Sequence, residues 1–178
     1  MQQRKVLIGV MAVAVLGVGW YLFRPERLWV NQTVNERLGS AAGSRAAGAR
    51  PAAMSGMQAE PESKVLASGM FHGVAHQTMG TATVYQVGEN KRVLRFTGFE
   101  TSNGPDVQVY MVAASDASDN ATVTKSGFVR LAALKGNRGD QNYELPADLD
   151  LSKYRAVTIW CRRFGVNFAT APLAPQPF

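Results

Sequence analysis

The stretch VTIWC, residues 157–161, decides the fold of this chain. Val157, Ile159 and Cys161 alternate with Thr158 and Trp160, and a period of two places alternate side chains on one face of a β-strand. β-Branched and aromatic residues, which favour strands, make up most of the stretch. The sequence therefore predicts a strand whose core-facing side carries Cys161.

Outward from this strand, the same alternating pattern recurs in short runs separated by turn residues. Further strands are predicted at 81–87, 92–97, 107–113 and 142–145. Residues 128–134 fit either a strand or a helical turn, and residues 114–126 are predicted to form a long loop. Short strands at this spacing, without a long helical pattern, indicate an all-β fold: an antiparallel β-sandwich or a flattened barrel.

The apolar positions change phase after Arg163. Phe164, Val166 and Phe168 continue the alternation one residue out of step with the strand before them. A β-bulge produces such a slip, so a bulge is predicted in this region.

The beginning of the chain has a different composition. Residues 6–23, VLIGVMAVAVLGVGWYLF, contain no charged residue, and a helix of this length spans roughly 27 Å, close to the thickness of a bilayer core. Because the run ends in GWYLFRP, a poor cleavage site, we predict an uncleaved transmembrane anchor rather than a cleaved signal peptide. Residues 1–5 would form a short cytoplasmic tail, with everything after residue 23 periplasmic or extracellular.

Two further parts follow the predicted anchor. Residues 24–64 are interpreted as a juxtamembrane segment and a flexible linker, because their Ala-, Gly- and Ser-rich part offers little apolar surface to offset the entropy of ordering. Residues 65–178 are predicted to form the β domain. That domain carries eleven basic and nine acidic side chains, without the basic stripe that nucleic-acid binding requires, so nucleic acid is not an expected partner.

Known catalytic signatures are missing from the sequence. It contains no nucleophile elbow, HExxH, phosphate loop or dinucleotide fingerprint, so an enzyme with its own substrate is the least favoured class. The lone cysteine cannot form an internal disulfide or a multi-cysteine metal cage.

Cys161 is nevertheless the sharpest candidate for chemistry. Arg162 and Arg163 follow it directly, and a guanidinium beside the sulfur would favour the thiolate. A thiolate can exchange electrons or ligate a haem iron or copper ion, the two candidate cofactors. The alternative is that Cys161 is a small hydrophobic residue of the core.

His72 and His76 are the supporting candidates. On a helix, a spacing of four would place both imidazoles on one face, where they could bind a metal ion. Here they precede a predicted strand and are flanked by glycines. The alternative interpretation is therefore two loop histidines with ordinary hydrogen bonds.

Residues 69–173 resemble the DM-thirteen domain, also called the electron-transfer DM-thirteen domain. The resemblance rests on five blocks in order: GMF at 69–71, GTA at 80–82, FETSNGPD at 99–106, LKGNRGDQNYELP at 134–146 and IWCRRF at 159–164. It implies a β-sandwich outside the cytoplasm, here in a membrane-anchored single-domain form. It also implies electron transfer through the family's characteristic cysteine, matched by Cys161, acting as a bare thiol or by holding a prosthetic group.

Two functions follow from the sequence. The first is a membrane-anchored extracytoplasmic domain with a redox role through Cys161, held by residues 6–23 and served by a redox partner protein. The second is a binding or adhesion module in which Cys161 is only structural and loops such as 114–126 contact a partner.

Overall fold

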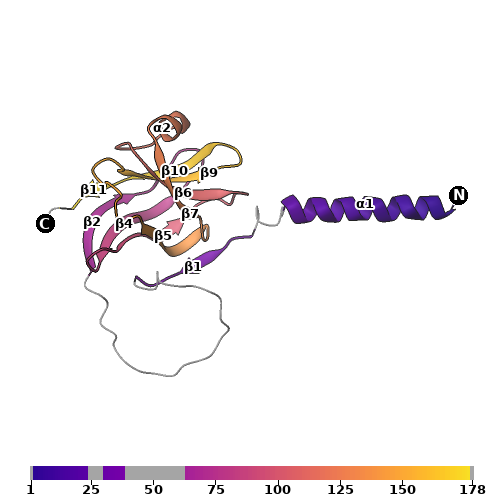
Figure 1. Cartoon of the computed structure of the whole chain (residues 1–178), viewed down its shortest axis with the longest axis horizontal. Helices are drawn as coiled ribbons and strands as arrows, with labels where there is room; N and C mark the ends of the chain where they lie inside the picture. The colour runs from indigo at the N-terminus through magenta and orange to yellow at the C-terminus, as the bar shows by residue number, and fades with distance from the viewer. Residues whose placement is uncertain (1, 24–29, 39–62, 177–178) are drawn as a thin grey trace, which may run out of the picture.

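Two sheets packed face to face form the domain, as the computed structural model shows (Figure 1). The structure describes residues 2–23, 30–38 and 63–176. All strand pairs but one are antiparallel. The predicted all-β sandwich is therefore confirmed.

The two sheets have different sizes. The six-stranded sheet has the order β1 (Thr33–Asn35), β8 (Arg138–Leu145), β5 (Arg92–Glu100), β4 (Met79–Val87), β2 (Ser63–Met70) and β11 (Ala174–Pro175). The five-stranded sheet has the order β3 (His72–Gly73), β10 (Val166–Pro172), β9 (Ala156–Cys161), β6 (Val107–Val112) and β7 (Phe128–Ala133). Each predicted strand corresponds to one of these, and the ambiguous stretch 128–134 is a strand.

The segment predicted as a long loop, residues 114–126, contains a short helix instead. Helix α2 spans Asn120–Lys125, and the carboxylate of Asp119 caps it by accepting the backbone N–H of Thr122 at 2.7 Å. A side-chain acceptor at this position satisfies one of the N–H groups left unpaired at a helix start. With only six residues, the helix is too short for its apolar periodicity to be recognised.

The change of phase after Arg163 has a different origin from the one predicted. Residues 162–165 form the turn between β9 and β10, so the alternation restarts on a new strand. A register irregularity does occur, but later, between Asn167 and Ala169 of β10.

Apolar side chains from both sheets fill the space between them. Phe71, Phe96 and Phe99 form an aromatic cluster at its centre, with ring centroids 4.9–5.1 Å apart. All three are almost fully buried, and each such side chain stabilises the fold by about 1.5–3 kcal/mol. Edge-to-face contacts between two of the ring pairs add to this burial.

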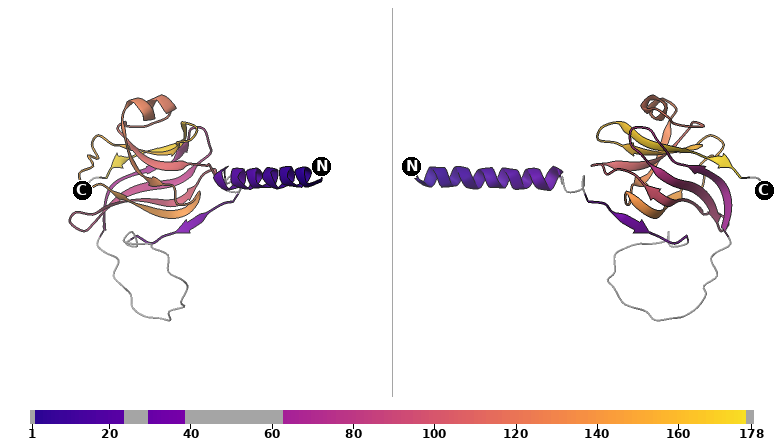
Figure 2. Two further views of the ribbon diagram at one scale, coloured as in Figure 1. Left: turned by 45° about the vertical axis from the view of Figure 1, so that its right-hand side comes forward. Right: turned by 180° about the vertical axis from the view of Figure 1, so that it is seen from behind.

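Four connections between strands lie together at one end of the sandwich. This end is formed by the connections β3–β4 (74–78), β5–β6 (101–106), β7–β8 (134–137) and β9–β10 (162–165). Strand β1 also begins there, since Thr33 is paired with Arg138 at the start of β8. We call this the near end, because the chain arrives at it from the N-terminal helix α1 (Gln2–Phe23) (Figure 2).

The N-terminal part differs from its sequence interpretation in one respect. Strand β1 lies within residues 24–64, which were interpreted as juxtamembrane segment and linker, yet it pairs in parallel with β8 of the sheet. Residues 24–29 and 39–62 lie outside the described part of the chain. Among the residues that the structure describes, we find no helix that is both long and apolar enough to span a membrane.

Candidate functional site

Cys161 is the last residue of β9 and points into the core. Its neighbours across the sheet are Val107 of β6 and Val166 of β10. Its relative exposure is 0%, and it belongs to the same core cluster as Val157 and Ile159. Within the described residues, no hydrogen bond or ion pair reaches the thiol. The predicted core-facing position is thus what the structure shows.

Arg162 points away from that sulfur. Its Nε donates to Oδ2 of Asp106 at 2.8 Å, and its backbone N–H donates to the Asp106 carbonyl at 2.9 Å. The hydrogen bond to this carboxylate raises the pKa of the Arg162 guanidinium. The positive charge next to Cys161 in sequence is therefore compensated by Asp106, on the other side of the strand. Arg163 is exposed in the turn that follows.

The two histidines are not brought together either. Nε2 of His72 lies 3.1 Å from Oδ2 of Asp116 in an exposed hydrogen-bond contact. The ring of His76 instead packs on Phe168, with centroids 3.9 Å apart. Among the described residues, no group of three or more His, Cys, Asp or Glu side chains could hold a metal ion. Within the described residues, His72, His76 and Cys161 therefore do not come together in a three-ligand set of the kind that a copper ion requires.

The near end does contain two adjoining hollows. The larger has a volume of about 900 Å³ and is lined by His76, Glu100 and Arg138 among others. The smaller has a volume of about 510 Å³, and both are lined by Asn31 and Asn137. Both are open and polar in part. Of the residues proposed from sequence, only His76 reaches either of them.

Asn137 lines both hollows, and three hydrogen bonds fix its side-chain amide. Its Nδ2 donates to Oδ1 of Asn31 at 2.8 Å and to the carbonyl of Thr101 at 3.1 Å. Its Oδ1 accepts the backbone N–H of Gln32 at 2.8 Å. Nearly buried, with 5% exposure, this amide has both of its polar atoms satisfied, as a buried amide requires. It thereby connects the segment before β1 to the β5–β6 connection.

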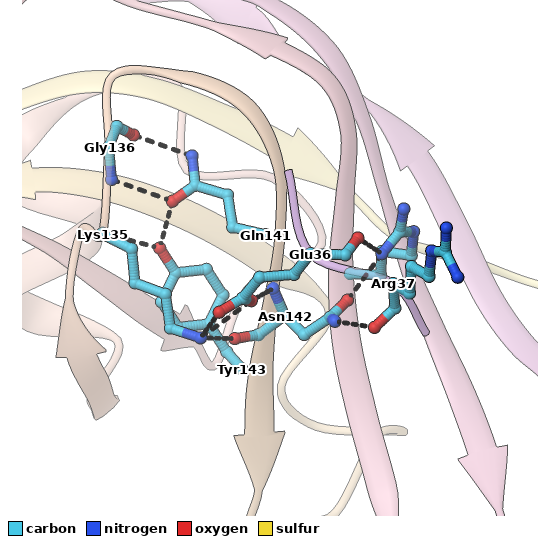
Figure 3. Close-up of polar contacts among 8 residues, drawn as sticks. Glu36, Arg37, Lys135, Gly136, Gln141, Asn142 and Tyr143 are labelled. Carbon is cyan, nitrogen blue, oxygen red and sulfur yellow. Dashed lines mark hydrogen bonds and ion pairs between the residues drawn. The ribbon is translucent and has the colours of Figure 1, made fainter. Parts of the chain in front are cut away.

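A second polar cluster fixes the other end of β1 (Figure 3). Nζ of Lys135 lies 2.8 and 2.9 Å from the two carboxylate oxygens of Glu36 and donates to the Asn142 carbonyl at 2.7 Å. Oε2 of Glu36 also accepts the backbone N–H of Asn142 at 2.7 Å. Arg95 adds a bond from its Nη1 to the Glu36 carbonyl at 2.8 Å. Charge-assisted bonds of this kind are stronger than neutral ones.

Next to this cluster, a buried amide supports the turn before β8 (Figure 3). Gln141, at 0% exposure, donates to the Gly136 carbonyl at 2.7 Å and accepts the Gly136 N–H at 3.2 Å. The hydroxyl of Tyr143 donates to the same amide oxygen at 2.8 Å. Desolvation by burial raises the pKa of Tyr143, so this hydroxyl remains a donor at neutral pH.

Two glycines allow β1 to approach so closely. A Cβ on Gly136 would collide with the carbonyl oxygen of Gln32, and a Cβ on Gly139 with that of Val34. Gly139 also has a φ of 91°, which side-chain-bearing residues rarely adopt. Glycines at these two positions are the sequence feature that could have indicated a strand docked beside β8. The docked strand itself, β1, is polar and has only three residues, so it shows no periodic pattern.

Comparison with known proteins identifies the family of this domain. Residues 70–173 match the family described as Electron transfer DM13. The chain belongs to the DM13 family. The matched region of this DM13 protein contains Cys161 and both histidines, whereas β1 and most of β2 precede it. No curated protein and no solved structure matches the chain.

Proposed function

We propose that this DM13 protein is a membrane-anchored electron-transfer protein whose domain lies outside the cytoplasm and whose redox group is Cys161. The observation that carries the proposal is the match of residues 70–173 to an electron-transfer family. Cys161 is the one cysteine of the chain and lies within that match. Cys161 is the last residue of β9, and the turn 162–165 follows it directly at the near end of the domain. We propose that a redox partner protein approaches the sulfur from this end.

Burial limits the chemistry that this thiol can perform. A neutral thiol that loses an electron must also lose its proton, because an isolated charge in the core is costly. Within the described residues no acceptor contacts the sulfur, so proton release requires the core around Cys161 to open. The same opening would be needed for the sulfur to meet another thiol, since exchange proceeds by direct attack.

The membrane anchor is proposed from the sequence of residues 6–23. These eighteen positions contain no charged residue, and they fall within helix α1. Its described large apolar side chains, from Val10 to Tyr21, are 57–78% exposed. Helices that are apolar on every side are stable when lipid or other protein covers them, and this supports the membrane anchor. The position of the β domain on the far side from residues 1–5 is proposed from the sequence alone.

A second function is supported by the surroundings of the sulfur. Full burial among valines and isoleucine, together with the pairing of Arg162 to Asp106, is what a structural cysteine requires. In that case the protein is an extracytoplasmic binding module, and the open hollows beside Asn137 are the surfaces available to a ligand.

Two measurements separate these functions. If Cys161 carries electrons, Cys161→Ser abolishes electron exchange with an electrode or a dye while the circular dichroism spectrum of the fold persists. If Cys161 is structural, the same variant retains whatever current the wild type shows and mainly loses stability. The visible absorption spectrum of protein purified in its native state adds an independent readout, because a Soret or thiolate–copper band would indicate a bound group.

A further inference from the structure

Large apolar side chains are exposed mainly at the near end of the domain. Among described residues outside α1, the four most exposed are Val30, Met70, Met79 and Phe164, at 61–76%. Each lies at the near end: before β1, at the end of β2, at the start of β4 and in the β9–β10 turn. Surface patches with this concentration of apolar residues often mark interaction sites.

The opposite end carries fewer and less exposed side chains of this kind. Val65 at the start of β2 and Phe128 at the start of β7 are 36% and 45% exposed. Phe128 also stacks on Tyr110, with centroids 4.5 Å apart, whereas no ring contact involves Phe164 within the described part of the chain. The asymmetry therefore distinguishes the near end from the rest of the surface.

Docking of β1 determines which end of the domain faces the proposed anchor. Eight Cα steps separate Phe23 from Asn31, a span of at most about 28 Å at full extension. Asn31 is held at the near end by Asn103 and Asn137, at 3.1 and 2.8 Å. If β1 were not docked, the first fixed residue would be Ser63, forty steps from Phe23 and up to roughly 140 Å away.

The charges of the near end are compatible with a lipid surface. Asp106 pairs with Arg162 at 2.8 Å, and Glu100 pairs with Arg138 at 2.7 Å. Lys135 is paired with Glu36 at 2.8 Å. Asp106 and Glu100, two acidic residues at this end, are thus each neutralised by an arginine and are not left to repel lipid phosphate groups.

We propose that the near end of the domain rests on the bilayer interface, with Phe164, Met79 and Val30 in the headgroup region and β1 holding the domain in that orientation. The inference rests on the proposed anchor in residues 6–23. Aromatic and apolar side chains favour this layer of a membrane. It follows that docking of β1 shortens the tether between anchor and domain to the residues before Asn31. It also follows that a redox partner reaches the near end of the domain from the plane of the membrane.

The experiment uses the full chain reconstituted in phosphatidylcholine vesicles. Phe164→Cys and its matched control Phe128→Cys, each in a Cys161→Ala background, are labelled with an environment-sensitive fluorophore, and quenching by doxyl-labelled lipid is measured. We expect quenching at position 164 and little at position 128. Equal quenching at the two positions, or none at either, in protein that floats with the vesicles would overturn the inference.

Two further readouts separate the parts of the argument. A chain that does not float with vesicles removes the anchor of the proposed function, whatever the labels report. Replacing residues 31–37 with a Gly/Ser segment of equal length leaves the sandwich core untouched and should abolish the difference between positions 164 and 128 while flotation persists. Unchanged quenching at position 164 in this variant would show that β1 does not orient the domain.

Discussion

Nζ of Lys135 lies 2.8 Å from Oε1 of Glu36, a contact between residues that are 99 positions apart in the chain. Glu36 follows β1, and Lys135 precedes β8. Because Glu36 also accepts the Asn142 N–H, one carboxylate attaches the segment around β1 to both the turn and the strand of the domain. This segment lies outside the region that matches the DM13 family, residues 70–173.

Glu36→Ala should weaken that attachment and lower the stability of the domain. The change leaves Lys135 with only the Asn142 carbonyl and the Asn142 N–H without its acceptor, and loss of hydrogen bonds to a charged group of limited exposure costs about 1–3 kcal/mol. Denaturant-induced unfolding followed by tryptophan fluorescence measures the loss. The matched control is Glu144→Ala, which removes the exposed ion pair with Lys91 and should change the free energy of unfolding by less than about 1 kcal/mol. Equal losses in the two variants would contradict the role assigned to Glu36.

Gly136→Ala should detach β1 without disturbing the core. The added methyl group would meet the Gln32 carbonyl oxygen, and backbone atoms give way at a higher cost than flexible side chains. Hydrogen exchange should therefore become faster at the β8 amides that face β1, while the amides of β4 and β5 remain protected. The control is Gly88→Ala in the β4–β5 turn, where the new Cβ meets nothing within 4 Å. That variant carries the strain of a positive φ of 90° but should leave β1 docked.

Periodic features of the sequence sufficed for the strands of the sandwich and for the direction of Cys161. Alternation along VTIWC places Cys161 with Val157 and Ile159, and the structure has all three in the core. The pattern works although all of β9 is buried, because its two faces pack against different partners: Val157, Ile159 and Cys161 lie in the core between the sheets, whereas Trp160 lies in a second buried cluster with Tyr110 and Val123.

Features that depend on distant residues could not be predicted in the same way. Strand β1 has three residues, TVN, and it is held in place by Lys135, Asn137 and the glycines Gly136 and Gly139, all of which are far from it in sequence. Likewise, Arg162 forms an ion pair with Asp106, 56 positions away, and does not interact with the adjacent cysteine through a hydrogen bond or ion pair. Sequence proximity alone therefore could not reveal that Arg162 pairs with Asp106.

The N-terminal cap of α2 makes the stability of the domain depend on pH in the acidic range. Hydrogen bonds from the backbone and side chain of Thr122 lower the pKa of Asp119. A carboxyl whose folded pKa is lowered stabilises the protein above the unfolded pKa of about 3.9, and this contribution is lost as the pH falls through the folded value. Asp119→Ala should thus lower Tm at pH 7, and the difference from wild type should shrink below about pH 4. Asp119→Asn, which retains a capping acceptor, should lose less at pH 7 and show a weaker pH dependence.

Arg162→Ala tests whether the neighbouring guanidinium influences the sulfur at all. Because Arg162 is paired with Asp106 and Cys161 is fully buried, the variant should leave the pH profile of Cys161 alkylation unchanged. Reaction with iodoacetamide should be slow in both proteins and should accelerate only when denaturant unfolds them, since the thiol has to leave the core to react. The cost in stability should be small, as for other exposed ion pairs. A shift of the alkylation profile to higher pH in Arg162→Ala, with the fold intact, would instead show that this arginine lowers the pKa of the thiol and would favour the redox function over the structural one.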